Sequence, residues 1–253
     1  MLKSVIAYFQ FFTRLIIPIR IDNPMIYLKS GSKYLPIVGL LLGMIEGIVF
    51  FTSSFLFPPV ISFIIMLVFN ALFTGAMHQD GLADMADGLF SSRTKEKMLS
   101  IMKDSRIGTM GVLALIFNYL FLIGIVTSYL DQFLGLNGVV LIIGMNITSK
   151  GSMTLLFYKL KYAGASLNGL GRNWENLPSK DILIAQTLTV ILLFVTTNVM
   201  GIISYLIVSF TVLLYRRHVY SKIEGMNGDT IGAISPISSI VFLLSICTIR
   251  SFL

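Results

Sequence analysis

The chain has 253 residues, of which 55% are hydrophobic and only 12% are charged. A soluble domain carries about 25% charged residues, so this composition argues against a soluble fold and indicates a membrane protein. The net charge of +7 could suggest a nucleic-acid partner. The basic residues lie between apolar runs, however, and form no stripe interleaved with aromatics, so we expect none. Cys247 is the only cysteine, which excludes an internal disulfide and a zinc site built from cysteines.

The first expected element is the apolar stretch Ser4–Ile19, which carries Arg14 in its middle. This charge, Arg20 and the lack of a small-residue cleavage site argue against a cleaved signal, and we predict an interfacial or partly inserted helix. A bilayer core of about 30 Å requires about 20 apolar residues in a helix. Seven later runs are candidate spans: Tyr34–Phe57, Pro59–Met77, Gly108–Leu130, Asn137–Tyr158, Ile182–Met200, Ile202–Tyr215 and Thr230–Ile249.

The fifth and sixth of these runs are separated only by Gly201, so they could form a tight helical hairpin or one broken element. The pattern predicts an all-α fold in which residues 1–253 form a single domain. This domain is a polytopic integral membrane bundle of about 6–7 transmembrane helices, with an interfacial N-terminal helix. The sequence shows no convincing internal repeat, which disfavours a carrier built from inverted repeats.

Lysine and arginine residues are distributed unevenly between the two sides of this predicted bundle. Of the 19, 17 lie in four segments, which precede the first span and follow the second, fourth and sixth spans. The connections on the opposite side, near Pro58, Asp131–Leu136 and Gly201, contain none. Because cytoplasmic loops are enriched in these residues, we predict a multi-pass protein of the cell membrane with these four segments in the cytoplasm.

Five of the twelve acidic residues lie in one stretch after the second span: Asp80, Asp84, Asp87, Glu96 and Asp104. In a helix the first three occupy positions i, i+4 and i+7 and project from one face, where like charges repel. A divalent cation would turn this repulsion into attraction, and Mg²⁺ prefers carboxylate, water and phosphate oxygens. The spacing therefore predicts a metal site, with a solvated connection between two spans as the plain alternative.

The residues around these carboxylates suit a substrate that contains phosphate. Lys103 and Arg106 flank Asp104, and cations beside a metal-binding carboxylate are what a pyrophosphate would require. Asp229, just before the last span, is either the N-cap of that helix or a further ligand on the same side. His78 could be a general base, a phosphate contact or an interfacial residue, and these three readings stay open.

Two further residues lie in unusual surroundings. Glu46 lies inside the first span, where a charge requires a partner or a polar cavity. Trp174 lies in a polar stretch, and we predict that it anchors the chain at the lipid headgroups.

Several motifs occur in order along nearly the whole chain: Phe12–Leu15, Pro36–Gly43, His78–Gly88, Ile101–Gly108, Gly169–Gly171 and Gly228–Ala233. Together they resemble the signature of the cobalamin synthase (adenosylcobinamide-GDP ribazoletransferase) family, and the aspartate segment is long and specific. The resemblance implies a magnesium-dependent transferase of the inner membrane, with its active site at the cytoplasmic face. Such enzymes join adenosylcobinamide-GDP to α-ribazole or its 5′-phosphate and release GMP in the last steps of cobalamin assembly.

The resemblance also implies roles for individual residues. Asp80, Asp84 and Asp87 would bind Mg²⁺, and Asp104 would be a further ligand or the base that accepts the ribazole hydroxyl proton. The catalytic candidates are therefore His78, Asp84 and Asp104, and the substrate-binding candidates are Lys103, Ser105, Arg106, Asp229 and Thr230. The expected partners are the two substrates and the lipid bilayer, and a homo-oligomer is left open.

The sequence departs from the family pattern at four positions. Gln79 stands where leucine is usual and Lys150 where arginine is common, while Pro236 and Ser239 replace expected glutamates. If those glutamates contribute to metal or corrinoid binding, this chain compensates or differs in substrate. These differences leave open which lower-ligand donor the chain uses. They bear less on the class of reaction.

Two other functions remain as alternatives. A CDP-alcohol phosphotransferase also presents aspartates to a metal-bound pyrophosphate, and the segment Asp80–Asp84 begins like its signature. The arginine that should follow and the final aspartate spacing are missing from the sequence. A cation-coupled transporter would need carboxylates at the bilayer midplane, where only Glu46 is expected.

Overall fold

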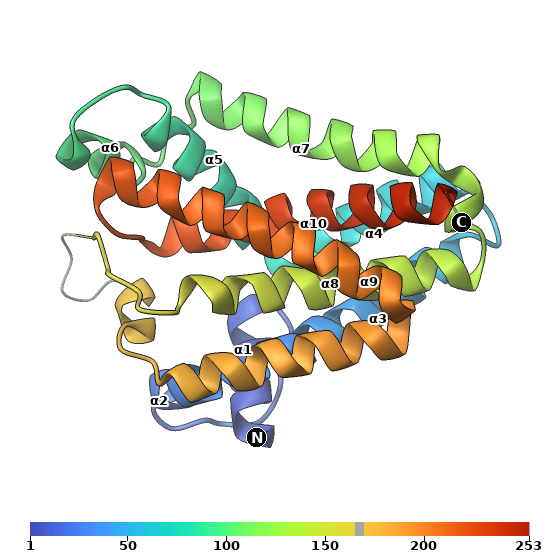
Figure 1. Cartoon of the computed structure of the whole chain (residues 1–253), viewed down its shortest axis with the longest axis horizontal. Coiled ribbons are helices and arrows are strands. Elements are labelled where there is room, and N and C mark those ends of the chain that lie inside the picture. Colours follow the sequence, from blue (N-terminus) through green and yellow to red (C-terminus); the bar gives the residue numbers. More distant parts are fainter. Residues whose placement is uncertain (165–169, 253) are drawn as a thin grey trace.

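The structure, a computed structural model, describes residues 1–164 and 170–252. These residues form helices and contain no strand, which confirms the predicted all-α fold (Figure 1). Gly169, part of one motif, lies outside the described residues. The α-helices are α1 (Leu2–Phe12), α2 (Pro24–Gly31), α3 (Leu35–Ser53), α4 (Pro59–Thr74), α5 (Met77–Leu89), α6 (Lys95–Ile101), α7 (Thr109–Ser128), α8 (Leu136–Leu156), α9 (Ser179–Ile223) and α10 (Gly228–Ser251). Short 3₁₀ helices are η1 (Ser32–Tyr34), η2 (Leu130–Phe133) and η3 (Leu170–Trp174).

Five helical segments of the described chain are long and apolar enough to cross a membrane, and six if α4 and α5 count as one bent span. α9 is 45 residues long, but Asn198 inside it has non-helical dihedral angles (φ 58°, ψ −158°). The two arms of α9 run in opposite directions from this break (Figure 1). Of the two arrangements left open around Gly201, the hairpin is the one that forms, and the polytopic membrane bundle is confirmed.

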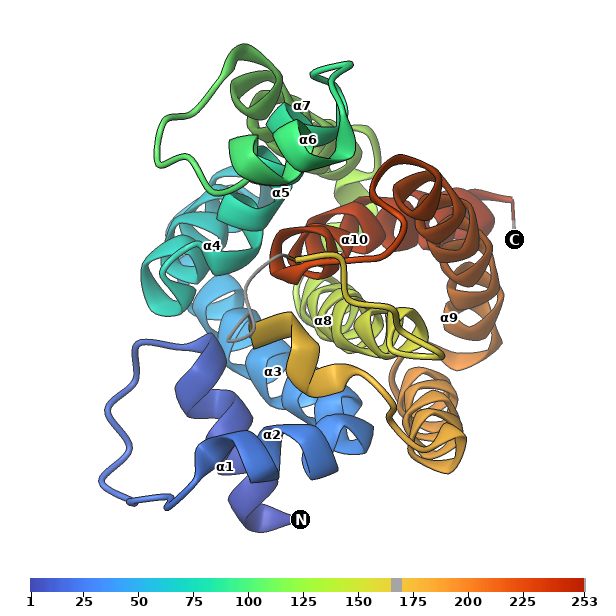
Figure 2. The same cartoon turned by 90° about the vertical axis from the view of Figure 1, so that its left-hand side faces the viewer.

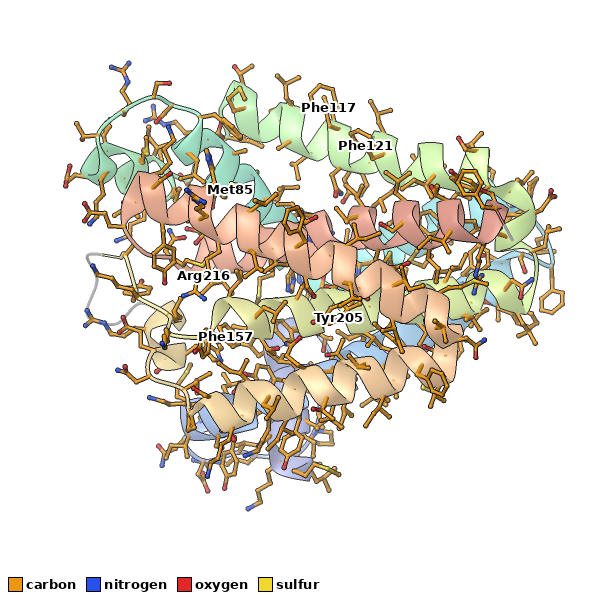
Figure 3. All side chains as sticks on the ribbon, viewed as in Figure 1. Met85, Phe117, Phe121, Phe157, Tyr205 and Arg216 are labelled. Carbon is orange, nitrogen blue, oxygen red and sulfur yellow. The ribbon has the colours of Figure 1, made fainter. Side chains whose placement is uncertain are left out.

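The helices differ in how much apolar surface they leave for lipid. Phe117 and Phe121 point outward from α7 and are 53% and 55% exposed (Figure 3). α8 lies at the centre, enclosed by α3, α9 and α10 (Figure 2). Gly39 of α3 lies so close to α8 that a Cβ there would be 2.5 Å from the carbonyl oxygen of Asn146. Small residues of this kind let membrane helices pack closely, where van der Waals contact drives association.

A sharp corner between α4 and α5 determines where the acidic segment lies. Gly75 (φ 65°) and Ala76 (φ 55°) adopt the left-handed conformation, and the helix axes differ by 88°. The Arg14 guanidinium lies against Gly75, where a Cβ would come 2.7 Å from its Nε. The positive φ at Gly75 therefore favours glycine. The predicted span Pro59–Met77 ends at Thr74 instead.

The N-terminal helix is shorter than predicted. α1 ends at Phe12 because Thr13 is extended (φ −130°, ψ 159°). The next amide, of Arg14, donates to the carbonyl oxygen of Phe73 at 2.7 Å. The prediction of a helix through Ile19 is therefore wrong beyond Phe12, and Arg14 leaves the helix to reach the α4–α5 corner.

The connections between helices separate into the two ends of the bundle. Those between α5 and α7, between α8 and α9, and between α9 and α10 lie at one end, on the left of Figure 1. The α3–α4 and α7–α8 connections and the bend of α9 lie at the other end. The left end therefore carries the three lysine- and arginine-rich segments that follow the second, fourth and sixth predicted spans, together with α5 and the start of α10.

Candidate active site

The acidic face of α5 lies beside the first turn of α10. α5, over Met77–Leu89, is the helix that the aspartate spacing suggested, and it buries Met85 on its opposite face (Figure 3). Asp80 is exposed and Asp84 is half-buried. α10 approaches closely at Gly81, where a Cβ would lie 3.0 Å from the carbonyl oxygen of Asp229. A residue from the end of the sequence thus joins the predicted acidic segment.

Asp80, Asp84 and Asp229 form an acidic cluster whose negative charges repel one another. None of the three forms an ion pair within the described residues. Lys103 attracts Asp229 electrostatically, and Asn227 Nδ2 donates to Asp229 Oδ2 at 3.0 Å. Neighbouring like charges destabilise each other unless a cation joins them, so this arrangement is suited to binding one.

A capping box at the start of α10 holds Asp229 in place. Asn227 Oδ1 accepts a hydrogen bond from the Thr230 amide, and Thr230 Oγ1 accepts one from the Asn227 amide, both at 2.9 Å. Asn227 is therefore the N-cap, and the reading of Asp229 as the cap is wrong. Thr230 is fully buried with its hydroxyl in this cap, so the geometry does not favour its predicted substrate role. Sequence reasoning missed Asn227, although Asn-x-x-Thr is a capping signal.

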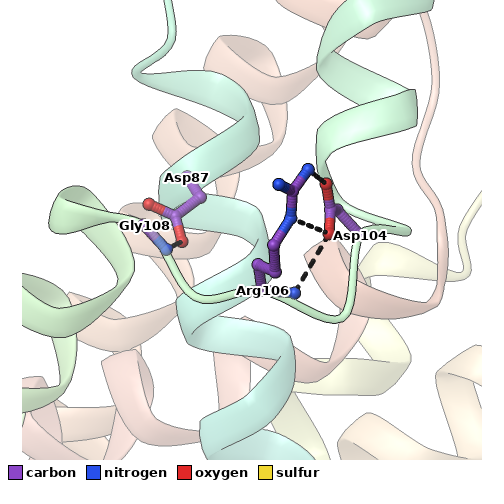
Figure 4. A network of polar contacts seen from close by, with 4 residues as sticks. All are labelled: Asp87, Asp104, Arg106 and Gly108. Carbon is purple, nitrogen blue, oxygen red and sulfur yellow. Dashed lines mark hydrogen bonds and ion pairs between the residues drawn. The ribbon is translucent and has the colours of Figure 1, made fainter.

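The carboxylate of Asp87, on the same face of α5, accepts hydrogen bonds from backbone amides. Its two carboxylate oxygens accept hydrogen bonds from the Gly108 amide at 2.6 Å and the Gly111 amide at 2.8 Å (Figure 4 draws the first). These amides belong to the N-terminus of α7, where unpaired donors and the helix dipole favour a carboxylate. Asp87 therefore caps α7 from a neighbouring helix.

Asp104 and Arg106 pair with each other in the connection that precedes α7. Arg106 Nε and Nη2 donate to the two oxygens of Asp104 at 3.0 and 2.7 Å, and the Arg106 amide donates at 3.1 Å (Figure 4). These hydrogen bonds from Arg106 lower the pKa of Asp104 to about 2. So acidic a group is a weak base near neutral pH, and the geometry does not favour Asp104 as proton acceptor. Lys103 and Ser105, beside this pair, are exposed.

The predicted metal ligands are thus only partly brought together. Asp80 and Asp84 share the acidic cluster with Asp229, whereas Asp87 and Asp104 are engaged elsewhere. Across residues 1–164 and 170–252, no three His, Cys, Asp or Glu side chains converge closely enough to hold an ion by themselves. Mg²⁺ commonly takes one or two protein carboxylates and completes its shell with water and substrate phosphates. The donor chemistry of the acidic cluster fits that ion.

A small polar cavity of about 60 Å³ lies inside the bundle, and His78 is one of the residues that line it. Lys150 Nζ lies 3.2 Å from His78 Nε2 and 4.9 Å from the centre of the Phe12 ring. The same ammonium lies 3.4 Å from the hydroxyls of Ser149 and Ser235. Because His78 is only 6% exposed, its interfacial reading is not supported.

Glu46 lines the same polar cavity and has the partners that its position requires. Asn70 Nδ2 and Asn146 Nδ2 donate to its two oxygens at 2.6 and 2.7 Å. Because Asn70 directs its amide nitrogen at this carboxylate, its Oδ1 is left to accept from Gln79 Nε2 at 3.3 Å. The expectation that Glu46 needs a partner or a polar cavity is confirmed.

The four departures from the family pattern also meet at this cavity. Gln79, Lys150, Pro236 and Ser239 all line it, although they come from three different helices. The sequence gives no sign of this convergence, because the positions are far apart along the chain. The differences therefore concentrate beside His78 and away from the acidic cluster.

A second cavity, the aromatic cavity, has a volume of about 190 Å³ and adjoins the acidic cluster at Asp80 and Asp229. Trp174 lines it, donates from Nε1 to the Tyr8 hydroxyl at 3.0 Å and stacks on Phe157 with ring centroids 5.4 Å apart. Trp174 is 6% exposed, so the prediction that it anchors at the headgroups is wrong. η3 instead directs this side chain into the bundle.

These features define an integral membrane helical protein with an acidic cluster beside a cavity lined by aromatic rings. The chain belongs to the CobS, cobalamin-5-phosphate synthase, family, which it matches over residues 4–247.

Curated relatives cover nearly the whole chain. A protein of Listeria monocytogenes serotype 4b (strain F2365) is 41% identical over 233 residues, which is 92% of each chain. One of Listeria welshimeri serovar 6b is 40% identical over 96% of each chain, and one of Clostridium novyi (strain NT) is 35% identical over 98% of each. All three are named adenosylcobinamide-GDP ribazoletransferase. No solved structure gives a significant match.

Proposed function

We propose that this chain transfers the adenosylcobinamide-phosphate group from adenosylcobinamide-GDP to α-ribazole, or to its 5′-phosphate, and releases GMP in cobalamin biosynthesis. The names of the relatives, which match over more than nine-tenths of the chain, support this reaction. The observation that carries it is the acidic cluster of Asp80, Asp84 and Asp229 beside the aromatic cavity. Neither a CDP-alcohol phosphotransferase nor a transporter is named among the relatives described above.

The reaction exchanges one P–O bond for another. The acceptor hydroxyl forms a bond to the phosphorus that carries adenosylcobinamide, the pyrophosphate P–O bond to GMP breaks, and the hydroxyl loses its proton. We expect a carboxylate of the acidic cluster to accept this proton, because Asp104, whose pKa Arg106 lowers to about 2, is a weak base. Lys103, which attracts Asp229, and Arg106, which pairs with Asp104, are exposed and would supply donors for phosphate oxygens.

Magnesium is the proposed cofactor. Asp80, Asp84 and Asp229 would hold it together with substrate oxygens, and the bound ion would neutralise charge on the pyrophosphate. Asp87 and Asp104 remain predicted ligands, but each would first have to release its present hydrogen-bond partners.

We further propose that the protein lies in the inner membrane with the acidic cluster at the cytoplasmic face. Three of the four lysine- and arginine-rich segments lie at the end of the bundle that carries α5 and the start of α10 (Figure 1). Positive residues favour the cytoplasmic side, which would also place the cluster where nucleotide-activated substrates are made.

The test is an assay of GMP release by the purified chain in lipid, with adenosylcobinamide-GDP, α-ribazole and magnesium. We expect GMP and a cobalamin product in equal amounts, and no GMP when α-ribazole is omitted. A CDP-alcohol and a lipid acceptor serve as the matched control reaction. Turnover of that pair, with none of the corrinoid pair, would overturn the proposal.

A further inference from the structure

The aromatic cavity has the size of a small planar ring system. Its volume of about 190 Å³ exceeds that of the dry cavities of about 150 Å³ that admit benzene. A bicyclic aromatic base therefore fits, whereas a corrin macrocycle is far too large. The rings of Tyr8, Phe12, Phe157 and Trp174 line the cavity, and aromatic rings pack favourably against one another in stacked or edge-to-face contact.

The aromatic wall offers a ligand ring surface and no free hydrogen-bonding group. The indole N–H of Trp174 is donated to the Tyr8 hydroxyl, and that hydroxyl donates in turn to the Leu28 carbonyl oxygen at 2.7 Å. Phe12 and Phe157 have no polar atoms. A guanine base would leave its polar edge unpaired against such a wall, which is unfavourable, whereas a methylated benzimidazole has no polar groups on its carbocyclic ring.

The opposite side of the cavity opens to the acidic cluster past glycines. A Cβ at Gly228 would meet no atom within 4 Å, and one at Gly232 would meet only the Cα of Gly81, at 4.0 Å. These positions therefore leave open space between the aromatic wall and Asp80 and Asp229. A nucleoside with its base against the wall would direct its sugar hydroxyls toward these carboxylates.

We propose that the aromatic cavity binds the dimethylbenzimidazole base of the ribazole acceptor and so delivers its ribose to Asp80 and Asp229. The inference rests on the proposed function and deepens it, because it assigns the acceptor rather than the nucleotide donor to this cavity. Trp174 and Phe157 are preorganised for this role, since their rings are already stacked with an interplanar angle of 6°.

The sequence supplies its own reporter, because Trp174 is the only tryptophan. α-Ribazole and free 5,6-dimethylbenzimidazole, titrated into the chain in lipid nanodiscs, should change the Trp174 emission saturably. GMP at the same concentrations should neither change this emission nor compete. The proposal is overturned if the chain turns over α-ribazole while the emission stays unchanged, or if GMP displaces the base.

A variant that fills the cavity gives the second measurement. Gly232→Leu adds bulk in the open space, and we expect the KM for α-ribazole to rise at least about tenfold while the KM for adenosylcobinamide-GDP stays unchanged. The matched control is Gly124→Leu, since Gly124 is exposed on α7 with nothing within 4 Å of its Cβ position. An unchanged KM for α-ribazole in Gly232→Leu would contradict the assignment.

The two measurements separate this proposal from the proposed function. Saturable emission changes without any GMP release would retain the base site and reject the reaction. GMP release with an unaltered α-ribazole KM in Gly232→Leu would retain the reaction and reject the site. Should Gly232→Leu fail to fold, the emission titration of the unaltered chain still decides the matter.

Discussion

The acidic cluster and the polar cavity contrast in how their charges are satisfied. In the polar cavity, Glu46 accepts from two asparagine amides at 2.6 and 2.7 Å, and Lys150 lies within 3.4 Å of three polar side chains. In the acidic cluster, Asp80, Asp84 and Asp229 repel one another and none has an ion-pair partner in the described part of the chain.

This difference indicates which region supports the fold and which binds a ligand. A hydrogen-bonded polar network inside a membrane bundle stabilises one packing arrangement, and disrupting it costs stability. Carboxylates without an ion-pair partner destabilise the fold by repelling one another, and this repulsion is relieved only when a cation binds. Mutations in the two regions should therefore separate activity from stability.

The largest expected effect is on activity, at Asp229. Asp229→Asn keeps the shape of the side chain but removes one charge of the acidic cluster, and we expect kcat for GMP release to fall about 100-fold. The melting temperature should stay the same or rise, because like-charge repulsion is relieved. Asp131→Asn, an exposed position at the other end of the bundle, is the control. Loss of stability in Asp229→Asn together with full activity would break the contrast.

The next effect is on stability, at Glu46. Glu46→Leu leaves the Asn70 amide nitrogen without an acceptor and the Asn146 amide nitrogen with only the Ile142 carbonyl oxygen. We expect the chain to lose about 2 kcal/mol of stability. Glu46→Gln retains one acceptor and should lose less. Thermal unfolding in lipid nanodiscs measures both variants. An unchanged melting temperature in Glu46→Leu, with activity abolished, would instead place Glu46 in the reaction.

A smaller effect tests whether Asp87 caps α7 or binds metal. Asp87→Ala removes the acceptor for the Gly108 and Gly111 amides, which should cost about 1 kcal/mol, as loss of a helix cap does. The magnesium concentration for half-maximal activity should not change in Asp87→Asn, which keeps an acceptor oxygen. A large shift in that concentration would restore Asp87 to the metal ligands.

The smallest effect is expected at Arg106. Arg106→Gln removes the side-chain hydrogen bonds that are the main cause of the lowered pKa of Asp104, about 2, whereas the backbone amide of residue 106 can still donate. The pKa should therefore rise part of the way toward the ordinary value near 3.9. A lowered pKa stabilises the folded chain only above the unfolded value, and this contribution is lost as the pH falls toward 2. The pair is exposed and screened, so the melting temperature at neutral pH should not change measurably. The KM for adenosylcobinamide-GDP should rise several-fold, and an unchanged KM would remove Arg106 from the phosphate site.

Much of the fold could be predicted because hydropathy and helix length carry the signal. The predicted spans that correspond to α3, α7, α8 and α10 differ from these helices by only a few residues at each end. The N-terminal stretch was predicted as helix through Ile19 because its apolar pattern continues, whereas the contact of Arg14 with the α4–α5 corner ends it at Phe12. That contact depends on tertiary structure and leaves no local sequence signal.

The candidate site was predicted in part, for a similar reason. The spacing of Asp80, Asp84 and Asp87 placed them correctly on one helical face, but it could not show that α7 would engage Asp87. Trp174 was assigned to the headgroups from its polar neighbours, and its burial against Phe157 follows from contacts between distant segments. Local pattern therefore located the carboxylates, while their division of labour depends on which helices meet them.

The measurement that tests the central claim most directly is magnesium-dependent GMP release by the unaltered chain, Asp84→Asn and Asp131→Asn in the same lipid. We predict release that requires magnesium, is lost in Asp84→Asn and is retained in Asp131→Asn, with neither variant melting below the unaltered chain. Release that persists at the same rate in Asp84→Asn would contradict the assignment of the acidic cluster as the reaction centre.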